Sequence, residues 1–314
     1  MGGPAPHRDF WIKAKEPIVQ PAGFDVLCIG SVLWDVIGRS AAVMRVGSDV
    51  PGRITRLPGG VALNIAMMLA RFGMRPALLS CIGRDSQGED LMAACRHLGL
   101  ETGMVYRSDD LPTDRYMAVE GANGLIAAIA DAHSLEAAGA RILRPFHDGR
   151  LANPYTGLVA LDGNLTLALL SEIAASPVFA GADLRVAPAS PGKADRLRPL
   201  IGHPGVTLYV NREEAGLLCQ LEFADAASAA EGLVARGAAR AVVTDGGRMA
   251  AEATQGQPTL TGAPPPVMVT RVTGAGDTFM AAHMAAESRG ATRQEALAEA
   301  LHRAAVYVSG EIGP

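Results

Sequence analysis

The feature that most constrains the fold is a repeated alternation of short apolar runs with helical segments. The apolar runs that we predict as strands are Phe24–Ile29, Ala77–Ile82, Gly157–Leu161, Leu184–Ala187, Val206–Val210 and Ala241–Thr244. The predicted helices are 61–72, Glu89–Leu98, Leu165–Ser176, Ala226–Arg236 and Thr278 to about Ser288. This alternation predicts an α/β fold with a mostly parallel sheet and helices on both faces.

The composition fits one large domain. The 314 residues are 49% hydrophobic, and no segment has the character of a linker, so we predict one domain over residues 24–314 after a loosely ordered arm at 1–23. The net charge of −4 and the absence of a basic run argue against nucleic-acid binding. Four widely spaced cysteines predict reduced, mostly buried thiols in a cytoplasmic protein. The sequence lacks an apolar run of about 20 residues, so we expect no membrane span.

Two segments interrupt the alternation, at 36–58 and 102–130. They contain short runs that we predict as strands, with an Asn123-Gly124 hairpin turn before the last: Ala42–Val46, Arg53–Leu57, Met104–Arg107, Arg115–Glu120 and Leu125–Ala130. We predict that the two segments together form one small β-sheet lid beside the main domain.

The stretch Val272–Phe279 reads V-T-G-A-G-D-T-F and leads into the last predicted helix, Thr278 to about Ser288. It follows the proline-rich run Ala263–Pro266 and a predicted short strand, Val267–Val269. Two glycines let the backbone approach a ligand, and amides at a helix start bind anions. With Asp277 beside them, these amides suit phosphoryl transfer to a hydroxyl. An ordinary strand-to-helix turn, with Asp277 as a first-turn acid, explains the stretch equally well.

A second glycine-rich stretch, Pro58-Gly59-Gly60, opens the helix that carries Asn64. Its glycines would let a small polar ligand reach backbone amides, although Asn64 could equally make a local cap. Polar residues also follow several strands, where ligands bind in open α/β sheets. These are Asp35, which we place in a loop, Asp162-Gly163-Asn164, Pro188–Lys193, Asn211–Glu214 and Asp245-Gly246-Gly247. One crevice could collect them all.

With these pieces in order, the chain resembles the PfkB/ribokinase family of sugar and nucleoside kinases over about residues 24–314. One motif is G-G-x-x-x-N-x-A with a later glycine, and it is carried by Gly59, Gly60, Asn64, Ala66 and Gly73. The other is T-G-A-G-D-x-F, carried by Thr273–Asp277 and Phe279. Between them lie Gly83-x-Asp85-x-x-Gly88, Asn211-x-x-Glu214 and Thr244-x-Gly246.

The resemblance implies a Rossmann-type domain with a small β lid used for dimer contacts, and transfer of the γ-phosphoryl group of ATP, with Mg²⁺, to a sugar hydroxymethyl. It implies that Asp277 is the catalytic base and that Gly274, Ala275 and Gly276 form the anion hole. By the same resemblance, the ATP contacts would be Lys193, Asn211, Thr244, Gly246, Thr273 and Gly276, and Asn211 and Glu214 would hold Mg²⁺. The substrate contacts would be Asp35, Gly59, Gly60, Asn64, Thr113, Asp162 and Asn164.

Within this family, four stretches are most similar to pseudouridine kinases: Leu161–Leu165, Pro188–Lys193, Arg115–Ala118 and Arg271–Gly274. Arg271 stands where many relatives carry an acid associated with a monovalent-cation loop, which puts activation by K⁺ in doubt. Other acceptors, such as ribose, adenosine or a ketose phosphate, stay open, as does a non-catalytic sensor. The chain has no G-x-x-x-x-G-K-[ST] P-loop, and Gly30-Ser31-Val32 lacks the glycines of a Rossmann dehydrogenase.

Overall fold

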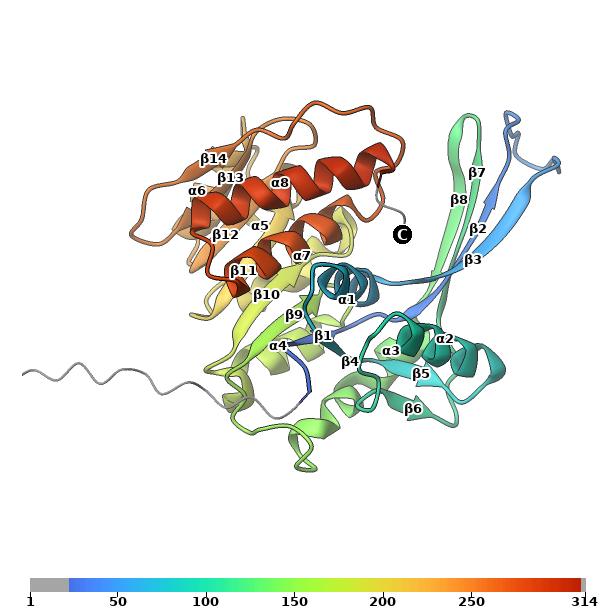
Figure 1. The fold of residues 1–314 in the computed structure, drawn as a ribbon, viewed down its shortest axis with the longest axis horizontal. Coiled ribbons are helices and arrows are strands. Elements are labelled where there is room, and N and C mark those ends of the chain that lie inside the picture. Colours follow the sequence, from blue (N-terminus) through green and yellow to red (C-terminus); the bar gives the residue numbers. More distant parts are fainter. Residues whose placement is uncertain (1–22, 312–314) are drawn as a thin grey trace, which may run out of the picture.

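The computed structural model describes residues 23–311. The arm predicted at 1–23 therefore lies, except for Gly23, outside the described residues. An eight-stranded sheet forms the centre of the molecule, in the order β14-β13-β12-β11-β10-β9-β1-β4 (Figure 1). Six of its strands are parallel: β1 (Val26–Ile29), β4 (Pro76–Leu79), β9 (Leu158–Asp162), β10 (Asp183–Ala187), β11 (Val206–Asn211) and β12 (Arg240–Thr244). The strands β13 (Ala250–Thr254) and β14 (Leu260–Gly262) add an antiparallel edge.

Side chains of the central sheet pack into two separate hydrophobic cores, one on each face, because successive residues of a strand point to opposite faces. Leu27 and Ile29 pack on one face, whereas Val26 and Cys28 pack on the other. The first face is covered by α3 (His133–Ala138), α4 (Leu167–Ala175), α5 (Arg212–Cys219) and α6 (Ala226–Ala235). The second is covered by α1 (Val61–Arg71), α2 (Ser86–His97), α7 (Ala275–Ser288) and α8 (Arg293–Ser309). The predicted α/β fold is confirmed.

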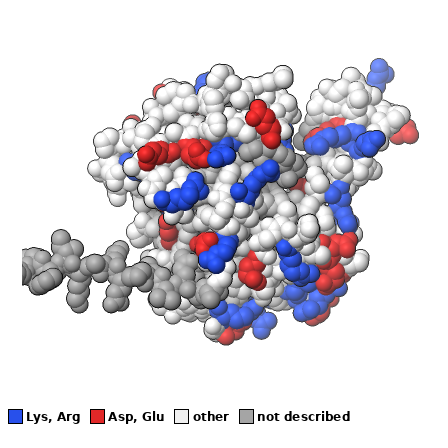
Figure 2. Space-filling view, viewed as in Figure 1, with Lys and Arg blue, Asp and Glu red and all other residues white. Residues whose placement is uncertain are grey.

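Three 3₁₀ segments complete the helical part of the described chain: Gly139–Phe146, Pro177–Phe179 and Pro191–Leu200. All four cysteines are buried and free, as predicted. In the described residues, no helix combines the length and the apolar character needed to cross a membrane. On the face drawn in Figure 2, basic and acidic side chains of the described residues are interspersed, in line with the nearly balanced charge.

A four-stranded sheet projects from the body, and we call it the side sheet (Figure 1). Its order is β3-β2-β7-β8, with β2 at Leu33–Arg39, β3 at Arg53–Gly59, β7 at Arg115–Gly121 and β8 at Gly124–Asp131. The predicted hairpin is present, because β7 and β8 pair antiparallel around Asn123. Two expectations are wrong here: Asp35 lies within strand β2 instead of a loop, and Ala42–Val46 forms no strand.

The apolar run Ala77–Ile82 is two strands instead of one. It divides at the buried Ser80 into β4, in the central sheet, and β5 (Cys81–Gly83). The strand β6 (Tyr106–Ser108), predicted as part of the lid, pairs in parallel with β5 in a separate small sheet. A continuous buried run gives no periodic signal at which to place the division.

The predicted strand Val267–Val269 is absent. The segment follows three prolines, no strand within residues 23–311 pairs with it, and Met268 is 81% exposed.

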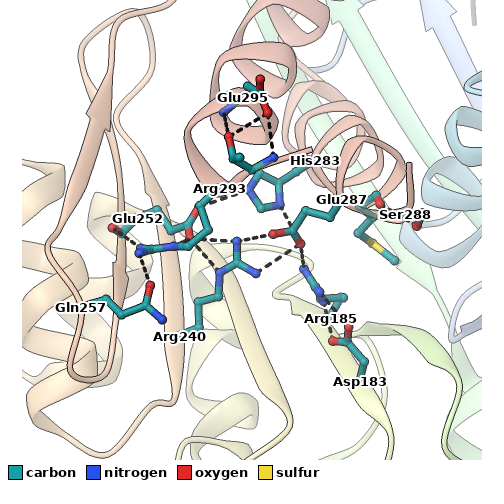
Figure 3. A network of polar contacts seen from close by, with 12 residues as sticks. Asp183, Arg185, Arg240, Glu252, Gln257, His283, Glu287, Ser288, Arg293 and Glu295 are labelled. Atoms are coloured by element: carbon teal, nitrogen blue, oxygen red, sulfur yellow. Dashed lines mark hydrogen bonds and ion pairs between the residues drawn. The ribbon is translucent and has the colours of Figure 1, made fainter. Parts of the chain in front are cut away.

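A buried network of charged side chains fixes the second half of α7 to the sheet (Figure 3). Glu287 of α7 accepts from Arg185 at 2.5 Å and from Arg240 at 2.6 Å. Glu252 of β13 accepts from Arg240 at 2.8 Å and lies 3.2 Å from the ring of His283. Because both carboxylates have partners, their burial is compensated. The network therefore fixes the position of the helix whose first turn carries Asp277.

Candidate active site

A pocket of about 620 Å³ lies between the side sheet and the start of α7, where the surface is hollowed (Figure 2). The side sheet contributes Asp35, Ile37, Arg39, Leu57, Pro58 and Glu120, and α1 contributes Asn64, Met67 and Met68. The opposite wall consists of Thr270–Gly274, Thr278, Tyr307 and Gly310. The pocket therefore joins segments that are more than 200 residues apart in the sequence.

The two glycine motifs meet in this pocket. Asn64, in the first turn of α1, donates through Nδ2 to Oδ2 of Asp277, in the first turn of α7, at 3.0 Å. Burial raises the pKa of Asp277 to about 7. The Asn64 hydrogen bond opposes this rise, and the nearby carboxylates of Asp162 and Asp35 add to it. Asp277 is thus placed to accept a proton near neutral pH.

The first turn of α7 leaves backbone amides available. Gly274 caps the helix with φ of 84°, a left-handed conformation that favours glycine. The Ala275 amide donates to the carbonyl of Val272 at 3.0 Å, and the first helical bond runs from Thr278 to Gly274. This arrangement leaves the amides of Gly276 and Asp277 outside the helical ladder. The expectation that the Ala275 amide belongs to the anion hole is therefore not supported, because the turn itself uses this amide.

Asp35 and the glycine pair form the opposite side of the site. Burial raises the pKa of Asp35, on β2, to about 6. A Cβ atom at Gly59 would lie 2.1 Å from the Asp35 carboxylate, and one at Gly60 would lie 2.5 Å from the carbonyl of Ser31. Gly60 also has φ of 100°. The glycines are thus required so that Asp35 and the turn after β1 can approach α1, a packing reason that the sequence alone did not reveal.

Asp162 has an internal role. It is completely buried and accepts from the amide and hydroxyl of Ser31, at 2.8 and 2.5 Å, and from the amide of Asn164, at 2.7 Å. The Ser31 hydroxyl in turn accepts from the Val61 amide at the start of α1. Direct contact of Asp162 with a substrate is therefore not supported. Sequence reasoning missed Ser31, although its position directly after the first strand was a usable signal.

Thr113 also has an internal role. It is 1% exposed, and its hydroxyl and amide donate to Asp85 at 2.7 and 2.8 Å. Asp85 caps α2 through the amide of Gly88, and a Cβ atom at Gly83 would lie 2.7 Å from the carbonyl of Leu111. The Gly83-x-Asp85-x-x-Gly88 motif therefore fastens the segment that leads into β7. The predicted substrate contact of Thr113 is not supported.

The residues predicted to bind the nucleotide lie mostly outside the pocket lining, at or just after the carboxyl ends of β10, β11 and β12. Asn211 and Glu214 form a capping box on α5, and Thr244 pairs with Asn211 across the sheet. Lys193 donates to Asn164 Oδ1 at 2.6 Å, and Gly246 has φ of 59°. Of the predicted nucleotide contacts, Thr273 alone lines the pocket, next to Gly274.

Among the described residues, the side chains form no cluster of three or more metal ligands. The capping box uses one oxygen of Asn211 and one of Glu214. Mg²⁺ usually keeps several waters and binds through substrate phosphates plus one or two carboxylates. The buried Glu214, which follows β11, could supply the carboxylate of such a site, in which waters and phosphates complete the coordination. It does not fit a site made of protein ligands alone.

Together, the fold and the pocket define a class. The chain belongs to the pfkB family of carbohydrate kinases, whose sequence model matches residues 24–311. It is 31% identical over 264 residues to the pseudouridine kinase of Escherichia coli strain K12, an alignment that covers 82% of this chain and 81% of that protein. The predicted family and kinase class are therefore confirmed.

Solved structures agree on the fold. The carbohydrate kinase from Agrobacterium tumefaciens superposes with a TM-score of 0.75 at 26% identity, over 90% of this chain and 89% of that one. Arabidopsis thaliana ribokinase, solved with ribose and ATP, superposes with a TM-score of 0.74 at 18% identity, over 93% and 94% of the two chains.

Proposed function

We propose that this kinase transfers the γ-phosphoryl group of ATP to the 5'-hydroxymethyl of a ribosyl substrate, with pseudouridine as the preferred acceptor. The observation that carries the proposal is the 3.0 Å contact between Asn64 and Asp277, next to the amides of Gly276 and Asp277, which lie outside the helical ladder at the start of α7. The 31% identity to a pseudouridine kinase over four fifths of both chains supports the choice of acceptor.

In this proposal, the pocket residues carry out an in-line transfer. The Asp277 carboxylate accepts the proton of the attacking hydroxyl, while Asn64 orients that carboxylate. The amides of Gly276 and Asp277 stabilise negative charge on the transferred group, an effect of about 3 kcal/mol for each donor. Asp35, Gly59, Gly60 and Asn164 shape the site for the sugar hydroxyls. When bound, Mg²⁺ supplies positive charge to the phosphates.

We also propose that the nucleotide binds along the carboxyl ends of β10 to β12. There, Lys193, Asn211, Thr244 and Gly246 would contact ATP, and Asn211 and Glu214 would hold Mg²⁺ through water. Thr273 and Gly276 would meet the phosphates at the start of α7. Calorimetric titration with MgATP tests this arrangement. A Glu214→Gln variant that folds and binds MgATP as tightly as the wild type would contradict the metal role.

A homodimer through the side sheet is proposed for the protein in the cytoplasm. The sheet face opposite Asp35 carries exposed apolar side chains: Ile54, Met117 and Ile129 are 80%, 47% and 62% exposed. Clustered apolar exposure of this kind marks an interaction surface. Sedimentation of the wild type and of Ile54→Glu tests it, and a monomeric wild type at micromolar concentration would refute it.

The acceptor is tested by following ATP consumption with pseudouridine, uridine, adenosine, ribose and fructose phosphates, using Asp277→Asn as the inactive control. The proposal is supported if pseudouridine saturates ATP consumption at a lower concentration than any other acceptor does. A preference for a sugar phosphate would favour a second candidate function, a sugar-phosphate kinase. Arg39 and Arg271 both line the pocket and could bind the phosphate of such a substrate. Binding of sugar or nucleotide without turnover would indicate a sensor. Replacing K⁺ by a large organic cation tests for cation activation.

A further inference from the structure

The segment 270–273 is fastened to the end of α8. The Thr270 amide donates to the carbonyl of Val308 at 2.8 Å. Arg271 donates through Nε to the carbonyl of Tyr307 at 2.8 Å, and its guanidinium carbon lies 3.8 Å from the centre of the Tyr307 ring. A guanidinium over the face of an aromatic ring is attracted by the ring's negative face. The orientation of the Tyr307 ring therefore depends on Arg271.

Tyr307 in turn contacts the turn that precedes α7. Its hydroxyl donates to the carbonyl of Thr273 at 3.0 Å. A Cβ atom at Gly274 would lie 2.5 Å from the same hydroxyl. A continuous set of contacts thus runs from Arg271 through Tyr307 to the Thr273–Gly274 turn, which lines the pocket.

The charge of Arg271 has no counterpart in the described part of the chain. No ion pair involves this residue there, and its Nη2 atom is buried without a hydrogen-bond partner. A buried donor without a partner is costly, and an uncompensated positive charge beside a helix start adds to the attraction for anions. Arg271 also lines the pocket next to Thr273 and Gly274.

We propose that Arg271 is a positioning residue for phosphoryl transfer. Its guanidinium holds Tyr307, Tyr307 holds the Thr273–Gly274 turn, and the unpaired charge favours phosphate at the amides of Gly276 and Asp277. The inference rests on the kinase activity proposed above. It assigns no proton transfer to Arg271 or Tyr307.

The test compares Arg271→Ala, Arg271→Lys, Tyr307→Phe and the double variant Arg271→Ala/Tyr307→Phe. Arg303→Ala is the matched control. Arg303 lies in α8, as Tyr307 does, and its guanidinium also stacks on an aromatic ring, that of Phe72, but it lies outside the pocket lining. Turnover, KM for ATP and KM for the acceptor are measured with whichever acceptor the wild type phosphorylates. Thermal unfolding of each variant identifies any that fail to fold.

Arg271→Ala should lose about tenfold or more in kcat with little change in KM for the acceptor, and Tyr307→Phe about fivefold, the scale of one hydrogen bond. The double variant should be no slower than Arg271→Ala, because both changes break the same set of contacts. Millimolar guanidinium chloride should raise the turnover of Arg271→Ala, whereas the same concentration of sodium chloride should not. Arg303→Ala should keep wild-type turnover.

A folded Arg271→Ala with wild-type kcat would overturn the proposal. So would additive losses in the double variant, or a loss that guanidinium does not relieve. If the wild type phosphorylates none of the acceptors, it is the proposed function that fails. Hydrogen exchange then still tests the contacts, because the amides of 273–277 should exchange faster in Arg271→Ala and in Tyr307→Phe than in Arg303→Ala. Unchanged exchange would overturn the inference.

Discussion

Replacing Asp277 by Asn should abolish activity and stabilise the protein at the same time. Burial and the neighbouring acids raise the pKa of Asp277 from 3.8 to about 7. Since one pKa unit corresponds to ~1.4 kcal/mol, the ionised carboxylate destabilises the folded state by roughly 4 kcal/mol above pH 7. Asn has the same shape and no charge, and its amide oxygen can still accept from Asn64. The variant should therefore unfold with a free energy about 2–4 kcal/mol higher at pH 8.

The gain should depend on pH in a defined direction. Above pH 7 the carboxyl is ionised in both the folded and the unfolded state, so the whole cost of burial is present. Between pH 7 and about 4 the folded state holds a proton that the unfolded state has released, and the cost declines. Near pH 4 the wild type and Asp277→Asn should be equally stable. Titrating groups that do not interact with Asp277 are common to both proteins and cancel in the difference.

Urea unfolding at several pH values between 4 and 8 measures this difference, and ATP turnover on the same samples measures activity. Turnover should fall by about a thousandfold or more. Asp245→Asn is the control of opposite sign, because ion pairs with Arg212 and Arg248 lower the pKa of Asp245. A variant at Asp277 that is no more stable than the wild type at pH 8, or a gain independent of pH, would refute the reasoning.

Three further outcomes follow from the same geometry. The logarithm of kcat/KM should rise with unit slope up to about pH 7, because Asp277 must be ionised; a profile flat down to pH 5.5 would contradict this. Gly276→Ala should fold at least as well as the wild type, since a Cβ atom there meets nothing within 4 Å, yet lose about tenfold or more in turnover, as a methyl group would face the phosphates. Glu252→Gln should lower the unfolding free energy in urea by about 3–5 kcal/mol, because Arg240 and Arg293 lose a buried partner; a loss below about 1 kcal/mol would argue against the network as a stabilising element.

The parts of the fold that the sequence predicts well are those with local signals. The glycine-rich stretches Gly59-Gly60 and Gly274-Ala275-Gly276 precede or begin helices, as their sequences predicted. The parallel strands of the central sheet follow from apolar runs between helices. Of the polar residues at strand ends that were predicted to share one crevice, Asp35 lines the pocket, whereas Lys193 and Asn211 lie outside its lining. Asn64 and Asp277, from the two glycine motifs, do meet.

What the sequence could not supply is the identity of internal partners. Asp162 and Asp35 are both acids that follow a predicted strand, yet Asp162 ends β9 and is enclosed by Ser31 and Asn164, whereas Asp35 lies within β2 and lines the pocket. Thr113 is bonded to Asp85, 28 residues earlier in the chain. Whether such a side chain bonds inside the protein or faces the pocket depends on which distant residue packs against it. A local sequence pattern does not identify that distant residue. The division of one apolar run at Ser80 was hidden for a similar reason, because both halves are buried.

The first turn of α7 has amides without helical partners, whereas its last turn carries the ionic network at Glu287. This difference explains the location of the network. The first turn must leave the amides of Gly276 and Asp277 open and must keep a costly carboxylate near neutral pKa. The helix is therefore held by its middle and far end, where Thr278–Ala286 are all buried and Glu287 binds two arginines. At 1.5 Å per residue, Glu287 lies roughly 15 Å along the helix from Asp277. Because the helix is rigid, a shift of its far end would move Asp277, the proposed catalytic base, so we expect variants that weaken the network to disturb the site as well.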